Sequence, residues 1–284
     1  MKLSLSNLAL PPTTTTGELA ALVALGARGI EVAPTRIAPW EELDAARLRD
    51  YRRQLDDAGL AVSSLQALLF GTSGLHLLQD AADFEAMGAH LRKVAAIGTV
   101  LGAGIGVFGS PRNRLRGALE VNAAWSLGRA RLRQLAEIVH EEGGFALGLE
   151  PVPAAYGGDY LGSFEEVVQM VREVDHPGLK VHLDTGCVQL GGGDIGAAVA
   201  AAGTLLGHFH IAEPQLGAFT APKAEHAKAA AALHGSGYTG WCAIEMMQQA
   251  PDPMAAAVEA VTFAAGTYGA GVEPPVTARG MSVG

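Results

Sequence analysis

The chain is short of cysteine and of long hydrophobic runs. Its 284 residues include two cysteines, Cys187 and Cys242, which are too few for a disulfide framework and favour reduced, intracellular thiols. No apolar run is long enough to span a bilayer, and residues 1–7 lack the apolar stretch of a secretory signal. We therefore expect a cytoplasmic protein with no membrane partner.

Positive charge is also scarce. Lysine and arginine number 20 against 29 aspartates and glutamates, so the net charge is -9 at pH 7. Because such a chain repels polyanions on average, no nucleic-acid partner is expected. Charged residues make up 17% of the chain and hydrophobic residues 49%, so the chain can bury a large core.

Short apolar runs alternate with amphipathic segments eight times along the chain. In one such segment Phe164, Val167, Val168 and Val171 recur at the spacing of one helix face. Strands that alternate with helices predict a parallel sheet, and eight such units predict a closed (β/α)₈ barrel of the α/β class, known as a TIM barrel. The expected strands are residues 3–10, 29–34, 61–70, 105–108, 145–150, 179–184, 205–211 and 241–246.

The barrel is expected to occupy residues 1–269 as one domain, because barrels of this size fold as a single unit. Residues 270–284 contain Pro274, Pro275 and Gly280 and show no apolar periodicity. We expect this last segment to be a mobile C-terminal tail.

Four potential metal ligands each close one of the expected strands. They are Glu150, Asp184, His210 and Glu245, on the last four strands. Because the carboxyl ends of barrel strands meet at one face, these side chains should lie close together. Two glutamates, an aspartate and a histidine form an oxygen-rich set that suits Mn²⁺, Mg²⁺ or Co²⁺. The alternative is four unrelated polar residues exposed in loops.

With these residues in place, the sequence resembles the xylose isomerase-like TIM barrel superfamily. That superfamily includes sugar isomerases, the tagatose and psicose 3-epimerases, and endonuclease IV. The likeness covers nearly the whole chain, weakly in the N-terminal half and well over residues 145–247. It is carried by LEP at 149–151, HLDTG at 182–186, GHFHIAEP at 207–214 and GYTGWCAIEM at 237–246.

The resemblance implies a metal site and a reaction. In the epimerase branch, the residues that match Glu150, Asp184, His210 and Glu245 hold one divalent ion. The two glutamates also serve as catalytic acid and base on opposite faces of the substrate. The implied activity is isomerisation or epimerisation of a sugar, sugar phosphate or related polyol through a metal-stabilised enediolate. Mn²⁺ is the expected cofactor, with Mg²⁺ and Co²⁺ as alternatives.

The chain departs from the epimerase pattern at two positions. Cys187 stands where epimerases and endonuclease IV commonly carry a histidine, and Leu216 stands where epimerases place an arginine. Both family residues help to hold substrate oxygens, which counts against ordinary ketose 3-epimerisation. The segment 211–214 instead resembles a less characterised branch of sugar phosphate isomerases and epimerases, which includes metal-bearing subunits that act on oxidised C-glycosides.

Three other functional classes are alternatives to this activity. A lyase of the same superfamily, either a dehydratase or a C-glycoside-cleaving enzyme, would share the proton abstraction and then eliminate. An endonuclease IV-like hydrolase would need three metals and a basic DNA-binding face, and the acidic balance and Cys187 count against it. A barrel that has lost catalysis is disfavoured by the four retained ligands. The expected partner is a small carbohydrate, and a homo-oligomer or a second subunit stays open.

Further residues are candidates for contact with the substrate. Arg112 and Arg114 follow the expected strand at 105–108 and could clamp a phosphate or carboxylate, or be solvated loop arginines. Cys187 and Glu213 lie beside the expected ligands and are candidates too, although no base partner marks Cys187 as a nucleophile.

Four more polar residues are placed by the expected fold, three of them inside the barrel and one on the surface. His182 and His208 should point into the barrel one layer below the ligands, as core histidines or as partners that orient Asp184 or His210. His182 is therefore retained as a candidate substrate-binding residue. Glu31 should point into the barrel mouth or form a structural ion pair, and His226 is expected on the surface.

Overall fold

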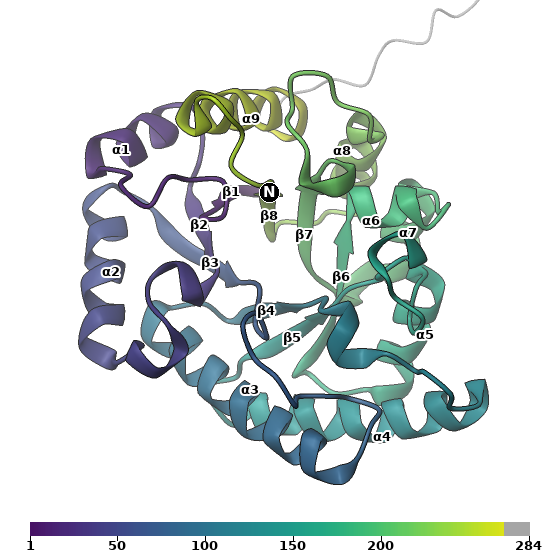
Figure 1. Cartoon of the computed structure of the whole chain (residues 1–284). Coiled ribbons are helices and arrows are strands. Elements are labelled where there is room, and N and C mark those ends of the chain that lie inside the picture. The colour runs from purple at the N-terminus through teal and green to yellow at the C-terminus, as the bar shows by residue number, and fades with distance from the viewer. Residues whose placement is uncertain (270–284) are drawn as a thin grey trace, which may run out of the picture.

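The computed structural model describes residues 1–269 of the chain. The expected tail at 270–284 lies outside the described residues. Eight parallel strands pair in chain order and close into a barrel, as predicted (Figure 1). The strands are β1 Lys2–Ser6, β2 Gly29–Val32, β3 Ala61–Leu65, β4 Ile105–Phe108, β5 Ala146–Leu149, β6 Leu179–Asp184, β7 Leu206–Ala212 and β8 Trp241–Glu245.

Helices surround the barrel and connect its strands (Figure 1). Among residues 1–269, no helix combines the length and the apolarity that a membrane span requires. The helices are α1 Thr16–Ala24, α2 Ala45–Asp57, α3 Ala81–Leu101, α4 Val121–His140, α5 Phe164–Val174, α6 Thr185–Leu190, α7 Ile195–Ala202, α8 His226–Gly235 and α9 Pro253–Tyr268.

Helix α5 shows how local sequence sets these elements. Ser163 caps its first turn, and its hydroxyl accepts from the backbone N–H of Glu166, whose carboxylate accepts from the N–H of Ser163 in return. Phe164, Val167 and Val171 are buried against the barrel, as the predicted helix face requires.

Five strands end earlier than predicted, and the difference is largest for β1 and β3. β1 stops at Ser6 because the following residues turn, and the Ser6 hydroxyl accepts from the N–H of Leu8 at 3.0 Å. β3 stops at Leu65, and Ala67 takes a left-handed backbone conformation with φ of 52°. Beyond these strand ends Ala9, Leu10, Leu68 and Leu69 are buried in turns instead of extended backbone, whereas Phe70 is exposed, so the apolar pattern alone overestimated the strand lengths.

The register of the last strands brings their polar residues together. On β6 and β7, His182 pairs with His208 and Asp184 pairs with His210. Because side chains alternate along a strand, these pairs form two layers inside the barrel, with the histidine pair beneath the Asp184–His210 pair. On β8, Glu245 pairs with Ala212, two residues beyond His210, and therefore lies at the mouth.

Candidate metal and active site

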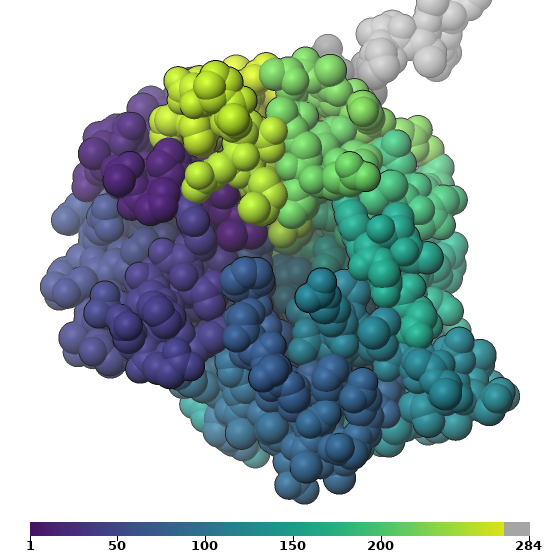
Figure 2. All heavy atoms as spheres, viewed as in Figure 1, coloured from purple at the N-terminus to yellow at the C-terminus, as the bar shows by residue number. Residues whose placement is uncertain are grey.

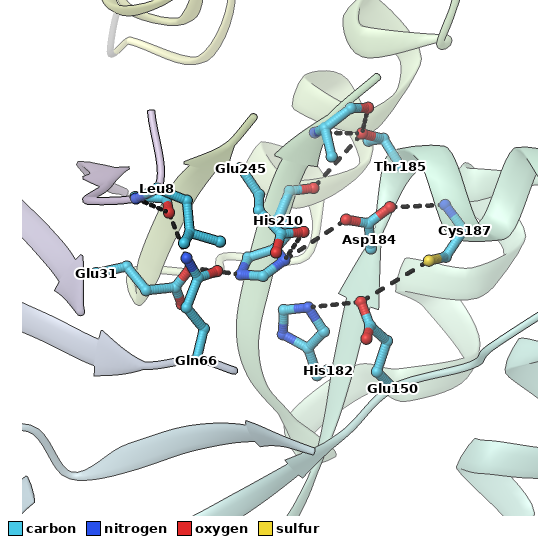
Figure 3. Close-up of polar contacts among 12 residues, drawn as sticks. Leu8, Glu31, Gln66, Glu150, His182, Asp184, Thr185, Cys187, His210 and Glu245 are labelled. Atoms are coloured by element: carbon cyan, nitrogen blue, oxygen red, sulfur yellow. Dashed lines mark hydrogen bonds and ion pairs between the residues drawn. The ribbon is translucent and has the colours of Figure 1, made fainter. Parts of the chain in front are cut away.

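The structure brings the four predicted ligands together at one end of the barrel (Figure 3). One atom of each of Glu150, Asp184 and His210 lies within 4.8 Å of the others. The Nδ1 atom of His210 lies 3.5 Å from Asp184 Oδ2 and 3.1 Å from Glu245 Oε2. Figure 2 shows that the molecule is hollowed at the centre of the face where the loops that follow the strands meet.

Backbone groups fix two of these carboxylates. Asp184 caps the start of α6, and its Oδ1 accepts from the N–H of Cys187 at 2.6 Å, which leaves Oδ2 facing His210. Glu150 packs against Gly109 in the loop after β4, where an added Cβ would collide with Glu150 Oε2. Glycine at position 109 is therefore needed for the Glu150 carboxylate to take this place.

Glu31 holds His210 from below. His210 Nε2 lies 2.8 Å from Glu31 Oε2, and His208 Nε2 lies 2.8 Å from Glu31 Oε1. Burial raises the pKa of Glu31, but the charges of His210 and His208 and their hydrogen bonds outweigh it and hold the pKa well below its usual range. An ionised carboxylate only accepts, so His210 donates through Nε2 and turns Nδ1 toward Asp184 and Glu245.

Gln66 was not singled out by sequence reasoning, yet it joins the site from the turn after β3. With its amide oriented to satisfy all partners, its nitrogen donates to Glu31 Oε2 at 2.8 Å and to Glu245 Oε1 at 3.0 Å, while its oxygen accepts from the Ser6 hydroxyl. The Ser64 hydroxyl also donates to Glu31 Oε1, at 2.7 Å. No local sequence signal marks either residue, because these contacts depend on how the strands pair in the folded barrel.

The carboxylates at the mouth are crowded. Burial raises the pKa of Glu150 to about 8, and the charges of Asp184 and Glu245 add to the effect. Burial likewise raises the pKa of Glu245, although His210 opposes this. Burial lowers the pKa of His210, but the charges of Glu31 and Glu245 outweigh it and raise that pKa well above its usual range.

This donor set fits a divalent cation. His210 Nδ1 is buried without a hydrogen-bond partner among the described residues, and oxygen atoms of three carboxylates surround it. Carboxylate oxygens with one imidazole nitrogen suit Mn²⁺, Mg²⁺ or Co²⁺. A histidine ligand whose other nitrogen donates to a carboxylate is also the usual arrangement at protein metal sites, and Glu31 supplies that carboxylate.

His182 and His208 lie fully buried beneath this cluster, as predicted. Burial lowers the pKa of His182 well below its usual range, and both of its nitrogens lack hydrogen-bond partners. Its Nε2 lies 3.5 Å from Glu150 Oε1, and its ring meets His210 edge-on with centroids 4.2 Å apart. His208 pairs with Glu31 through Nε2, whereas neither ring nitrogen of His182 has a hydrogen-bond partner among the described residues.

The other candidate substrate contacts differ in their burial. Arg112 is exposed, whereas Arg114 is buried and is not a solvated loop arginine. The thiol of Cys187 lies 3.8 Å from Glu150 Oε1, inside the site. Burial raises the pKa of that thiol well above its usual range, and the charges of Asp184 and Glu150 add to the effect, so it stays protonated.

Glu213 is engaged elsewhere. Its carboxylate accepts from the backbone N–H groups of Lys223 at 2.7 Å and Ala224 at 3.2 Å, and it lies 2.6 Å from His226 Nε2. His226 is 3% exposed and its Nδ1 lies 2.8 Å from the Tyr268 hydroxyl, so its expected surface position is wrong. These contacts fasten the loop after β7 to α8 and α9.

The chain belongs to the xylose isomerase-like TIM barrel family, whose model matches residues 19–265. A search of curated proteins finds no match to the chain.

Several solved structures share the fold. A D-psicose 3-epimerase crystallised with D-fructose is 19% identical, with a TM-score of 0.78, 95% of this chain and 100% of that chain covered. A D-psicose 3-epimerase with D-tagatose from Clostridium cellulolyticum H10 is 17% identical, with a TM-score of 0.79 and coverages of 94% and 99%. A probable 3-DHS dehydratase from Bacillus anthracis is 14% identical, with a TM-score of 0.72 and coverages of 94% and 99%.

Proposed function

We propose that this protein is a divalent-metal-dependent isomerase or epimerase of a sugar, sugar phosphate or related polyol. The observation that carries the proposal is the convergence of Glu150, Asp184 and Glu245 around Nδ1 of His210. The likeness in fold to solved sugar epimerases agrees with it. We expect the enzyme to act in the cytoplasm on a small carbohydrate.

The four ligands would hold one ion, with Mn²⁺ as the expected metal. When bound, a divalent ion supplies Lewis-acid stabilisation of the negative charge that develops on substrate oxygens. Glu31 fixes the orientation of His210, and the N–H of Cys187 fixes Asp184. These contacts hold the ligands before substrate arrives, so little rearrangement is required during the reaction.

Glu150 and Glu245 are assigned as the proton-transferring pair. Their side chains are 11% and 18% exposed, whereas those of Asp184 and His210 are 3% and 1% exposed. A substrate in the mouth therefore reaches the two glutamates first. Because they stand on β8 and at the end of β5, they can approach one carbon from different directions. One removes a proton beside the carbonyl to give an enediolate, and the other returns a proton.

A lyase is the second candidate, because it would begin with the same proton removal. Cys187 and Leu216 count against ordinary ketose 3-epimerisation, because the histidine and arginine that epimerases carry at these positions help to hold substrate oxygens. It differs from an epimerase only in the next step, in which a leaving group departs from the neighbouring carbon. Loss of water or of an aglycone from the substrate would identify this outcome.

Reaction in D₂O tests the proposal. The Mn²⁺-loaded protein would be incubated with a panel of ketoses that includes D-psicose, D-tagatose and D-fructose, and with their phosphates. We expect deuterium at the carbon beside the carbonyl of the product. Glu150→Gln and Glu245→Gln should each lower turnover by about 10²–10⁴-fold, the usual contribution of a positioned base. Complete retention of the original hydrogen, moved to the neighbouring carbon, would indicate a hydride shift and contradict these two roles.

A further inference from the structure

Arg114 is a buried arginine at the edge of the site. It ends the short 3₁₀ turn Pro111–Arg114 in the loop after β4 and is 1% exposed. Its Nη2 donates to the backbone carbonyl oxygen of Glu150 at 2.5 Å. Its Nε and Nη1 have no acceptor among the described residues. Arg112, two residues earlier in the same turn, is exposed.

Burying this guanidinium is costly. A charge taken out of water must be paired or hydrogen-bonded to be tolerated. Burial lowers the pKa of Arg114 to about 10, although the charge of Glu150 opposes the shift. The side chain nevertheless stays charged at neutral pH. Among the described residues, its one hydrogen bond is therefore the one to the backbone carbonyl oxygen of Glu150.

The backbone at Glu150 has few other restraints. Its N–H donates to Phe108 at 3.4 Å, which is a long hydrogen bond, and the next residue, Pro151, has no N–H to donate. Strand β5 has already ended at Leu149. The contact from Arg114 is therefore the short hydrogen bond that fixes this peptide unit, from which the Glu150 carboxylate reaches toward Asp184 and His210.

We propose that Arg114 is a positioning residue that holds the peptide of Glu150 in place and so keeps its carboxylate within the metal-binding cluster. In this role it acts through Glu150. This inference rests on the proposed function only in taking Glu150 as a metal ligand. The mechanical part, that Arg114 orders the end of β5, stands independently of it.

The test compares Arg114→Met with Arg112→Met, a matched control in the same turn. Calorimetric titration with Mn²⁺ should show a 10–100-fold loss of affinity for Arg114→Met, the usual effect of removing a group that orients a ligand. Arg112→Met should bind like the parent protein. Arg114→Lys, which keeps the charge but not the planar fork, should recover part of the loss.

Hydrogen exchange over residues 145–152 gives a second readout that needs no metal. We expect faster exchange there in Arg114→Met than in Arg112→Met. If Arg114→Met does not fold, Arg114→Lys is compared instead, with the same direction expected in both measurements. Parent-like affinity and parent-like exchange would overturn the inference. If the parent protein binds no divalent ion, the proposed function is wrong, and the exchange experiment alone decides the role of Arg114.

Discussion

The two halves of the barrel contribute different things to the site. The second half, β5 to β8, supplies the four predicted ligands Glu150, Asp184, His210 and Glu245. Their carboxylate oxygens and Nδ1 of His210 lie together at the mouth of the barrel. The first half, β1 to β4, supplies no predicted ligand. It provides most of the buried groups that orient the ligands, namely Glu31, Ser64, Gln66 and Gly109, whereas Asp184 is held by the N–H of Cys187 in the second half.

This division shows that a metal ligand and the residue that orients it have different structural requirements. A ligand must stand where substrate and ion can reach it, so it falls at a strand end. Its support must exclude water and can lie deep in the barrel, and Glu31 is accordingly fully buried. Each half should therefore respond differently to substitution, and three predictions test that difference, from the largest expected effect to the smallest.

Substitution of a ligand in the second half should abolish the site. Asp184→Ala or His210→Ala removes one of the four proposed metal ligands. Most bound metal and nearly all activity should therefore be lost while the barrel still folds. Metal analysis of the purified proteins measures this directly. Asp159→Ala is the matched control, because Asp159 accepts only from backbone N–H groups of Arg116 and Gly117. Unchanged metal stoichiometry in Asp184→Ala and His210→Ala would remove these residues from the ligand set.

Substitution of the main support in the first half should weaken the site without destroying it. Glu31→Gln keeps the size of the side chain, but its amide can accept from only one of His208 and His210. His210 is then no longer held with Nδ1 toward the carboxylates, and metal affinity should fall about 10–100-fold. Calorimetry of the variant decides the question. If affinity is unchanged, the orienting role of Glu31 is wrong and the two halves do not differ as described.

Glu213 sharpens the comparison, because it lies in the second half yet serves structure. Glu213→Gln leaves the ligands intact, so metal affinity should not change. It weakens the contacts to Lys223, Ala224 and His226, which should cost about 1–3 kcal/mol of unfolding free energy. Denaturant unfolding and metal titration of the same sample separate the two effects. Lower metal affinity with an unchanged free energy of unfolding would contradict this structural role and indicate that Glu213 contributes to the metal site.

The barrel could be predicted because its evidence is repetitive. Eight apolar runs at regular spacing are informative even when individual boundaries are wrong, as they were at the ends of β1 and β3. The convergence of four ligands followed from one rule, that the ends of parallel strands meet. The supports could not be found in this way. The partners of Glu31 on β7 are 177 and 179 residues distant in sequence, and only barrel closure makes them neighbours.

The same limit applies to residues whose role depends on one close approach. Gly109 carries no chemistry of its own, and its importance appears only when the Glu150 carboxylate is seen against it. The sequence also could not distinguish Arg112 from Arg114, since both follow β4 and differ by two positions in a short turn. Their difference in burial depends on how the loop packs onto the end of β5.

Anomalous X-ray scattering from Mn²⁺-soaked crystals tests the central claim most directly. We predict one strong anomalous peak at the mouth of the barrel, bounded by the carboxylates of Glu150, Asp184 and Glu245 and by Nδ1 of His210. The peak should be absent from crystals of Asp184→Ala treated in the same way. A parent protein with no peak at this position, or with its only peak elsewhere, would contradict the metal site and the function proposed from it.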